Sequence, residues 1–240
     1  HGANVIACPE KGIGRTRQWL IDNTDADYIL MFDDDLYFFY RVKPMQIALK
    51  PCRVKRLKRA IRMLFRWMEL DGVKHVGMAP RTEAGFYLCD YRTVTRQNNV
   101  HGFDVKFMRK AKRKWDVRFT KLRVMEDFCV TLDLFKHGVP NRVLLDVVWN
   151  QPGSNTAGGC STYRTAEQQR KSAKALGRMH PDVVKVVKKK VVGKTSWEGM
   201  KERTDVRIQW RQAYRGPIEP HWIVERSSLR SKVIKQKRAA

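Results

Sequence analysis

The chain has 240 residues, in which 49 Lys and Arg stand against 24 Asp and Glu, so its formal net charge is +25. This length suits one large α/β domain, or one domain with a tail. Such an excess of positive charge favours a polyanionic partner, with nucleic acid ahead of an anionic membrane. The apolar runs are too short to span a bilayer and no signal-peptide pattern opens the chain, so no membrane association is expected.

The five cysteines are scattered, odd in number and without a Cys-x-x-Cys pair. A disulfide framework and a zinc site are therefore not expected. A reducing cytoplasm is the expected location.

The amino-terminal part reads as a strand, a loop and a helix. Residues 3–8 are an apolar run, the loop contains two glycines, and residues 15–23 have a helical pattern that includes Arg15 and Arg17. A further strand follows at 28–36. This order predicts a parallel pair joined by a right-handed crossover.

Three adjacent carboxylates, Asp33, Asp34 and Asp35, end the apolar run Tyr-Ile-Leu-Met-Phe that begins at Tyr28. Like charges packed together repel, and a hard divalent cation such as Mg²⁺ or Mn²⁺ neutralises them. A buried strand would deliver these acids to the carboxyl end of a sheet strand, where open α/β sheets bind ligands. We predict that this acidic cluster binds a metal ion. The alternative is a solvated acidic turn.

Two basic segments are candidates for contact with DNA. Residues 53–70 predict an amphipathic helix with a basic face, and residues 106–123 contain nine Lys or Arg against a single acid, with aromatic residues interleaved. Between them, strands are predicted at 73–80, 86–94 and 100–108. The alternatives are a solvated helix face for the first segment and an ordinary hairpin or helix for the second. The candidate DNA-binding residues are Arg59, Arg62, Arg109, Lys110, Lys112, Arg113 and Lys114.

The acidic pair Glu126-Asp127 opens a predicted helix. Acids at this position complement the helix dipole, and the alternative is that one of them is a general base. A strand at 141–149 and a polar loop at 150–160 follow, then a helix near Thr165. The loop has glycines for close backbone approach but no P-loop lysine, so a kinase-like NTPase is disfavoured.

Taken together, these motifs resemble the GT-A glycosyltransferases, and most closely the phage DNA glycosyltransferases found beside TET/JBP-type dioxygenases. The similar stretches are Tyr28–Leu36, Met125-Glu-Asp-Phe and Gly153-Ser-Asn-Thr-Ala-Gly-Gly-Cys-Ser-Thr-Tyr-Arg164, and the resemblance covers about residues 4 to 182. It implies an α/β, GT-A-like domain over 1–182 with a mostly parallel sheet flanked by helices. The first β/α unit would be absent or shortened. Residues 183–240 would form a basic C-terminal extension.

The resemblance also implies a reaction: metal-dependent transfer of a sugar from a nucleotide sugar, such as UDP-glucose or UDP-GlcNAc, to the hydroxyl of a 5-hydroxymethylpyrimidine in DNA. Asp33 and Asp35 would hold Mn²⁺ or Mg²⁺, with a late histidine such as His180 as a candidate third ligand. Asp127, or else Glu126, would be the base. The donor-binding residues would be Arg15, Arg17, Asp33, Asp34, Asn155, Gly158 and Gly159.

Three other functions share some of these features. One is a non-catalytic nucleic-acid-binding protein on the same scaffold, and another is a glycosyltransferase with an anionic glycan or membrane-surface acceptor. A two-metal nuclease is disfavoured because no His or Lys lies near the acids in the sequence.

Overall fold

The computed structural model describes residues 6–43, 48–84, 87, 89–151, 165–191 and 201–217. They form two compact units, each assembled from distant parts of the chain. The sheet unit comprises the described residues of Tyr28–Asp104, Leu134–Pro152 and Trp210–Ala240. The hairpin unit comprises those of His1–Asp27, Val105–Asp133 and Gly153–Gln209.

The sheet unit contains a seven-stranded mixed sheet in the described residues. Its strands are β1 (Tyr28–Phe32), β2 (Tyr37–Arg41), β3 (Leu49–Pro51), β4 (His75–Pro80), β5 (Tyr91–Thr93), β6 (Val100–Asp104) and β7 (Asn141–Asn150). The order is β1-β6-β4-β7-β2-β3, and β5 pairs with a further part of β7. Only β4 and β7 are parallel neighbours in this described sheet.

An α/β fold is confirmed, but the sheet is mostly antiparallel, so the prediction of a mostly parallel sheet is wrong. A hydrophobic pattern shows that a segment is buried; it does not show which neighbour a strand takes or in which direction. Here β6 lies between β1 and β4 and runs opposite to both. Residues 6–8 form no strand, and residues 3–5 lie outside the described residues.

Strand direction nevertheless creates a shared edge. β1 and β4 are both antiparallel to β6, and β7 is parallel to β4, so β1, β4 and β7 run the same way. Their carboxyl ends therefore lie at one edge of the sheet, which we call the carboxyl edge. Asp33 follows β1 at this edge, and Gln151 follows β7.

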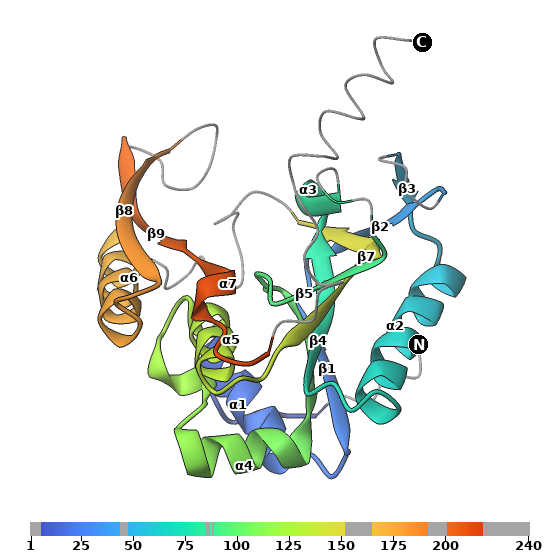
Figure 1. The fold of residues 1–240 in the computed structure, drawn as a ribbon, viewed down its shortest axis with the longest axis horizontal. Coiled ribbons are helices and arrows are strands. Elements are labelled where there is room, and N and C mark those ends of the chain that lie inside the picture. The colour runs from blue at the N-terminus through green and yellow to red at the C-terminus, as the bar shows by residue number, and fades with distance from the viewer. Residues whose placement is uncertain are drawn as a thin grey trace. The chain divides into compact units, whose positions relative to one another are not determined.

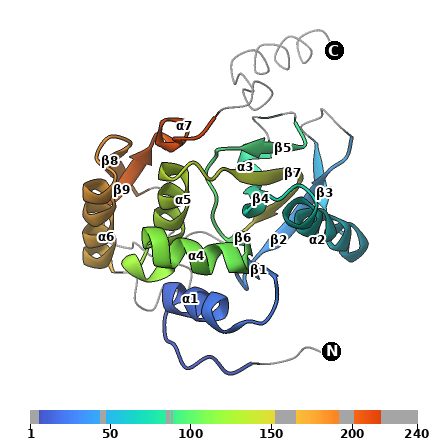
Figure 2. The ribbon, with the colours of Figure 1, turned by 60° about the horizontal axis from the view of Figure 1, so that its bottom comes forward.

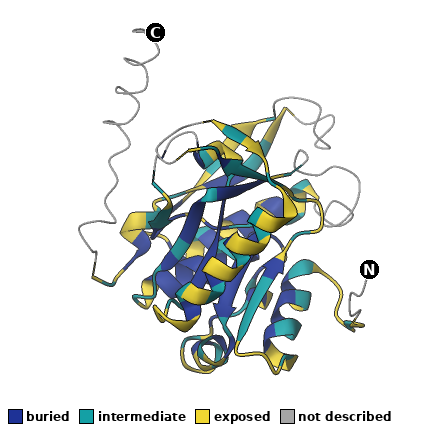
Figure 3. Cartoon of the chain, turned by 90° about the vertical axis from the view of Figure 1, so that its right-hand side faces the viewer, coloured by how far each residue is buried: buried dark blue, intermediate teal, exposed yellow. Residues whose placement is uncertain are grey.

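Helix α2 (Val54–Glu69) packs on the sheet through an apolar stripe. Leu64 and Met68 are buried in one cluster with Val76 and Met78 of β4. The basic side of α2 carries exposed residues (Figure 3). Because Leu64 is fully buried, its truncation to Ala would cost roughly 2–5 kcal/mol. The apolar stripe thus fixes α2 on the sheet and leaves its charged face in solvent.

The hairpin unit is mainly helical. Its elements are α1 (Ile13–Asn23), α4 (Val105–Trp115), the short 3-10 helix η1 (Phe119–Lys121), most of α5 (Glu126–Lys136), α6 (Ala166–Met179), β8 (Val184–Lys190) and β9 (Glu202–Ile208). β8 and β9 form an antiparallel hairpin on which α6 packs, and α1 and α4 lie side by side (Figures 1 and 2). The predicted boundary between residues 182 and 183 falls inside this unit. The short helices α3 (Arg81–Ala84) and α7 (Trp210–Ala213) belong to the sheet unit.

Local signals located most of the helices. The Thr165 hydroxyl accepts a hydrogen bond from the Gln168 N–H at 3.1 Å, as expected of an N-cap, and α6 ends before Pro181. The strand predicted at 100–108 instead ends at Asp104, where α4 begins. No helix in the described part of the chain combines the length and apolar character that crossing a membrane requires.

Candidate active site

Asp33 lies at the carboxyl edge and is held by Asn99. The Asp33 N–H donates to the Asn99 carbonyl oxygen at 3.1 Å, and Asn99 Nδ2 donates to Asp33 Oδ2 at 2.8 Å. Asp33 is half-buried, whereas Asp34 and Asp35 are exposed in the turn that leads to β2. The fold therefore presents one oriented carboxylate beside two that are open to solvent.

Asn99 has an unusual backbone and two acceptors for its amide. Its φ is 63°, in the left-handed region that Asn tolerates better than most residues. It is buried, and its Nδ2 also donates to Gln151 Oε1 at 2.5 Å. A carboxamide has two N–H donors, so both contacts can form together. In the sequence, residue 99 falls between the strands predicted at 86–94 and 100–108, and the Asn98-Asn99 pair is the one local signal.

The Gln151 contact connects the acids to the polar loop. Asn150 ends β7 opposite Tyr37 of β2, and Gln151 comes next in the chain. The predicted donor-binding residues Asn155, Gly158 and Gly159 lie outside the described residues. The loop thus begins beside Asp33, joined to it through Asn99.

In the hairpin unit, Arg17 and Glu126 form a buried ion pair. Arg17 Nη1 lies 3.0 Å from Glu126 Oε1, and the two side chains are 6% and 7% exposed. The Arg17 guanidinium also lies 5.9 Å from the centre of the Phe119 ring. Removing one partner of such a pair leaves an uncompensated buried charge. The structure therefore joins one predicted donor residue to one predicted catalytic residue.

Gly12 and Gly14, the two glycines that precede Arg15, each have a structural role at the start of α1. Gly12 caps α1 with a φ of 98°, which side chains disfavour. A Cβ on Gly14 would lie 2.6 Å from the Phe119 carbonyl oxygen and 3.5 Å from Glu126 Cγ. Gly14 thus lets α1 approach close enough for Arg17 to reach Glu126. Arg15, on the same helix, is exposed.

Asp127 differs from Glu126 in its surroundings. It is half-buried in the first turn of α5, and its Oδ1 accepts a hydrogen bond from the Phe128 N–H at 2.8 Å. Acids in this turn are favoured by the helix dipole. The Asp127 carboxylate is partly open to solvent, whereas that of Glu126 is buried.

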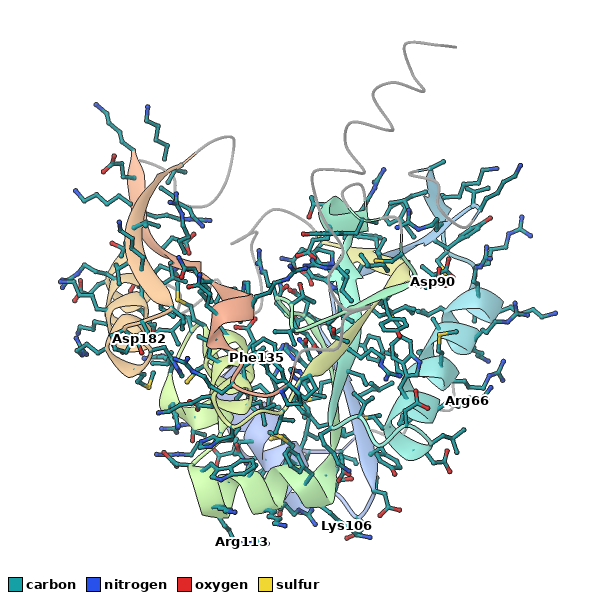
Figure 4. All side chains as sticks on the ribbon, in the orientation of Figure 1. Arg66, Asp90, Lys106, Arg113, Phe135 and Asp182 are labelled. Atoms are coloured by element: carbon teal, nitrogen blue, oxygen red, sulfur yellow. The ribbon has the colours of Figure 1, made fainter. Side chains whose placement is uncertain are left out.

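The basic residues of α4 divide into two groups. Arg109 donates to the carbonyl oxygens of Ile21, Asp22 and Thr24, at 2.9, 3.2 and 2.6 Å, and so holds the end of α1. Lys112 also contacts this helix end, because its Nζ lies 2.7 Å from Asp22 Oδ2. The exposed residues of this helix are Lys106, Lys110, Arg113 and Lys114, of which Figure 4 labels Lys106 and Arg113.

A basic cavity of about 750 Å³ lies at the amino end of α2. Arg56 lies over the Tyr40 ring, 4.0 Å from its centre. Arg53, the N-cap of α2, makes no side-chain capping bond, so backbone N–H groups of the first turn add positive potential. The sequence analysis singled out Arg59 and Arg62 on this helix; Arg59 lines the cavity and Arg62 is exposed outside it. The lining residues are Tyr40, Lys50, Pro51, Cys52, Arg53, Lys55, Arg56 and Arg59.

A second polar cluster is buried in the hairpin unit. His180 Nε2 lies 3.4 Å from Asp133 Oδ1, and Cys129 Sγ lies 3.8 Å from Asp133 Oδ2. Lys121 Nζ lies 2.8 Å from the same Oδ2. Burial and the neighbouring Asp133 carboxylate raise the pKa of the Cys129 thiol well above its ordinary value. His180, which the sequence analysis named as a candidate third metal ligand beside Asp33 and Asp35, lies instead in this cluster, next to Asp133.

Comparison with protein-family models, curated proteins and solved structures finds no match for this chain.

Proposed function

We propose that the protein is a metal-dependent glycosyltransferase that moves a sugar from a nucleotide sugar to the hydroxyl of a 5-hydroxymethylpyrimidine in DNA. The observation that carries this proposal is the Asp33–Asn99–Gln151 contact at the carboxyl edge. It combines an oriented carboxylate, two exposed carboxylates and the start of a glycine-rich loop where ligands of open α/β sheets bind. The resemblance of these motifs to GT-A enzymes supplies the reaction class.

A hard divalent cation would bind at the Asp33–Asp35 turn. Asp33 and Asp35 offer carboxylate oxygens, which Mn²⁺ and Mg²⁺ prefer as ligands. When bound, the metal neutralises charge on the departing nucleoside diphosphate. Asp34, exposed in the same turn, would accept a hydrogen bond from the sugar. The uncharged amide of Asn99 would keep the Asp33 carboxylate oriented and leave its negative charge available to the metal.

The proton of the acceptor hydroxyl would go to Asp127. The oxygen of the acceptor hydroxyl then forms the bond to the anomeric carbon, and the bond from that carbon to the diphosphate breaks. We assign this role to Asp127 rather than Glu126, because the Glu126 carboxylate is buried against Arg17. The exposed Arg15 would contact the donor phosphates.

The DNA backbone would bind the basic cavity at the amino end of α2 and the exposed cations of α4. The cavity joins guanidinium and ammonium groups to one aromatic ring, a combination that suits phosphate and an accessible base. In this arrangement Arg109 would stabilise α1 rather than contact phosphate. The cations of the cavity and of α4 would retain the acceptor while its target base leaves the stack.

The test is to incubate the protein with hydroxymethylated DNA, UDP-glucose or UDP-GlcNAc, and Mn²⁺, and to weigh the intact DNA by mass spectrometry. We expect one sugar mass per modified base. Asp33→Asn should abolish the increment, and Asp25→Asn, at an exposed position before β1, should keep it. An absence of any increment with every nucleotide sugar tried, from a full-length chain, would exclude the proposal.

The basic cavity by itself favours a second function, non-catalytic binding of nucleic acid. In that case DNA affinity would depend steeply on salt. The mass of the DNA would stay the same with or without Mn²⁺, and with wild type or Asp33→Asn. The same mass measurement separates the two functions.

A further inference from the structure

Three buried side chains of the hairpin unit converge on one point. The ligand atoms of Cys129, Asp133 and His180 all lie within 4.8 Å of one another. Each residue is buried, and His180 Nε2 makes no hydrogen bond within the described residues. Buried polar atoms almost always have partners, so a ring nitrogen left in this state beside a thiol and a carboxylate calls for a ligand.

The spacing of these atoms matches a tetrahedral metal site. Metal–ligand bonds of about 2.0 Å to nitrogen or oxygen and 2.3 Å to sulfur put neighbouring ligands roughly 3.3–3.6 Å apart. His180 Nε2 lies 3.4 Å from Asp133 Oδ1, and Cys129 Sγ lies 3.8 Å from Asp133 Oδ2. Each separation is close to the edge of such a tetrahedron, with one carboxylate oxygen facing each neighbour.

We propose that Cys129, Asp133 and His180 bind one Zn²⁺ ion that joins α5 to the end of α6. A thiolate and an imidazole select zinc over the harder Mg²⁺ and Mn²⁺. Cys129 and Asp133 are four residues apart on α5, and so face the same side, while His180 is the C-cap of α6. The inference depends on these contacts alone and not on the proposed glycosyl transfer.

Lys121 competes with the metal for the same carboxylate. Its Nζ lies 2.8 Å from Asp133 Oδ2, but also 3.5 Å from Asp116 Oδ2. On metal binding the thiol of Cys129 loses its proton to solvent, and Lys121 turns toward Asp116. Removal of the lysine charge should therefore tighten metal binding, whereas a simple Lys121–Asp133 ion pair predicts no effect on metal.

The probe is Co²⁺, added to chelator-treated full-length protein and followed by absorption. We expect a thiolate-to-cobalt charge-transfer band that saturates at one equivalent and disappears when Zn²⁺ is added. Cys129→Ser should eliminate the band, and Cys89→Ser, at a half-buried cysteine of the sheet unit, should keep it. No band in the wild type, or a band unchanged by Cys129→Ser, would overturn the proposal.

Lys121→Met should have opposite effects on two quantities: stability without metal should fall, and zinc affinity should rise. The variant leaves the buried Asp133 without its cation, so it should unfold at lower temperature in the absence of metal. With Zn²⁺ its affinity should rise by roughly tenfold over the wild type, and the zinc-induced increase in Tm should be larger. Equal or weaker zinc affinity in Lys121→Met would contradict the inference, even if the cobalt band were present.

Discussion

Asp33 in the sheet unit and Glu126 in the hairpin unit are both acids that the sequence assigns to chemistry, yet the fold holds them differently. Asn99, an uncharged amide, orients the half-buried Asp33. Glu126 is buried against the guanidinium of Arg17. A neutral donor fixes a carboxylate without cancelling its charge, whereas in a buried ion pair each charge compensates the other. The comparison favours Asp33 as a metal ligand and Glu126 as a structural residue.

The largest expected effect separates these two acids by stability. Glu126→Gln should lower the free energy of unfolding by roughly 3–5 kcal/mol, because Arg17 stays buried and loses the Glu126 carboxylate. Asp33→Asn should change it by less than about 1 kcal/mol. Urea unfolding measures both. The double variant Arg17→Met/Glu126→Leu is the control and should recover most of the loss. Equal losses for the two single variants would break the comparison.

Asn99→Gly tests whether orientation matters at the sheet edge. Glycine keeps the left-handed backbone of residue 99 but removes both amide contacts, so Mn²⁺-dependent transfer should fall by roughly 10- to 100-fold. Stability should change little. Asn99→Ala, in contrast, should also lose about 1–2 kcal/mol of stability because Ala tolerates a φ of 63° less well than Asn or Gly. Transfer rates and urea midpoints for the pair distinguish lost orientation from lost folding.

His75 is a buried ionisable group for which the described residues provide no ion-pair partner. His75 is fully buried in β4, and its Nε2 lies 3.4 Å from His101 Nδ1. Burial lowers the pKa of His75 to about 3. Its pKa in the unfolded chain is near 6.5, so the folded state binds fewer protons. Stability from this group is complete above pH 6.5 and falls as the pH drops toward 3. We expect a loss of about 2 kcal/mol between pH 6.5 and 5.

His75→Leu should flatten that pH dependence, whatever its effect on stability at pH 7. Urea midpoints at pH 5, 6 and 7 provide the measurement. A slope unchanged in the variant would mean that other groups cause it.

The smallest expected effect concerns the basic cavity. Arg53→Ala with Arg56→Ala should weaken binding of plain duplex DNA by roughly tenfold and reduce the slope of log affinity against log salt by about 2. Lys174→Ala, at an exposed position of α6, is the matched control. Fluorescence anisotropy at several salt concentrations gives both numbers. An unchanged slope would place the DNA elsewhere.

Local pattern predicted most of the elements but not how they pair. The spacing of Leu64 and Met68 located α2, and Thr165 with Gln168 located the start of α6, because these signals lie within a few residues of each other. The direction of β6 depends on neighbours that are distant in the sequence, so the parallel sheet was predicted wrongly.

The candidate site was visible in part for the same reason. Three consecutive acids after an apolar run are a local signal. In the structure, Asp33 lies at the carboxyl edge, directly after β1. Asn99 is 66 residues away from Asp33, and Glu126 is 109 residues away from Arg17. Contacts of that separation follow from the folded topology. The sequence therefore named Arg17 and Glu126 singly but not their pairing, and it did not name Asn99.

The most direct test of the central claim is a calorimetric titration of UDP into the protein with and without Mn²⁺. The account predicts that UDP binds the wild type only with Mn²⁺ present, and that Asp33→Asn removes this binding while the variant remains folded. UDP binding that is independent of Mn²⁺, or that is equally strong in Asp33→Asn, would contradict the assignment of the Asp33–Asp35 turn as a metal and diphosphate site.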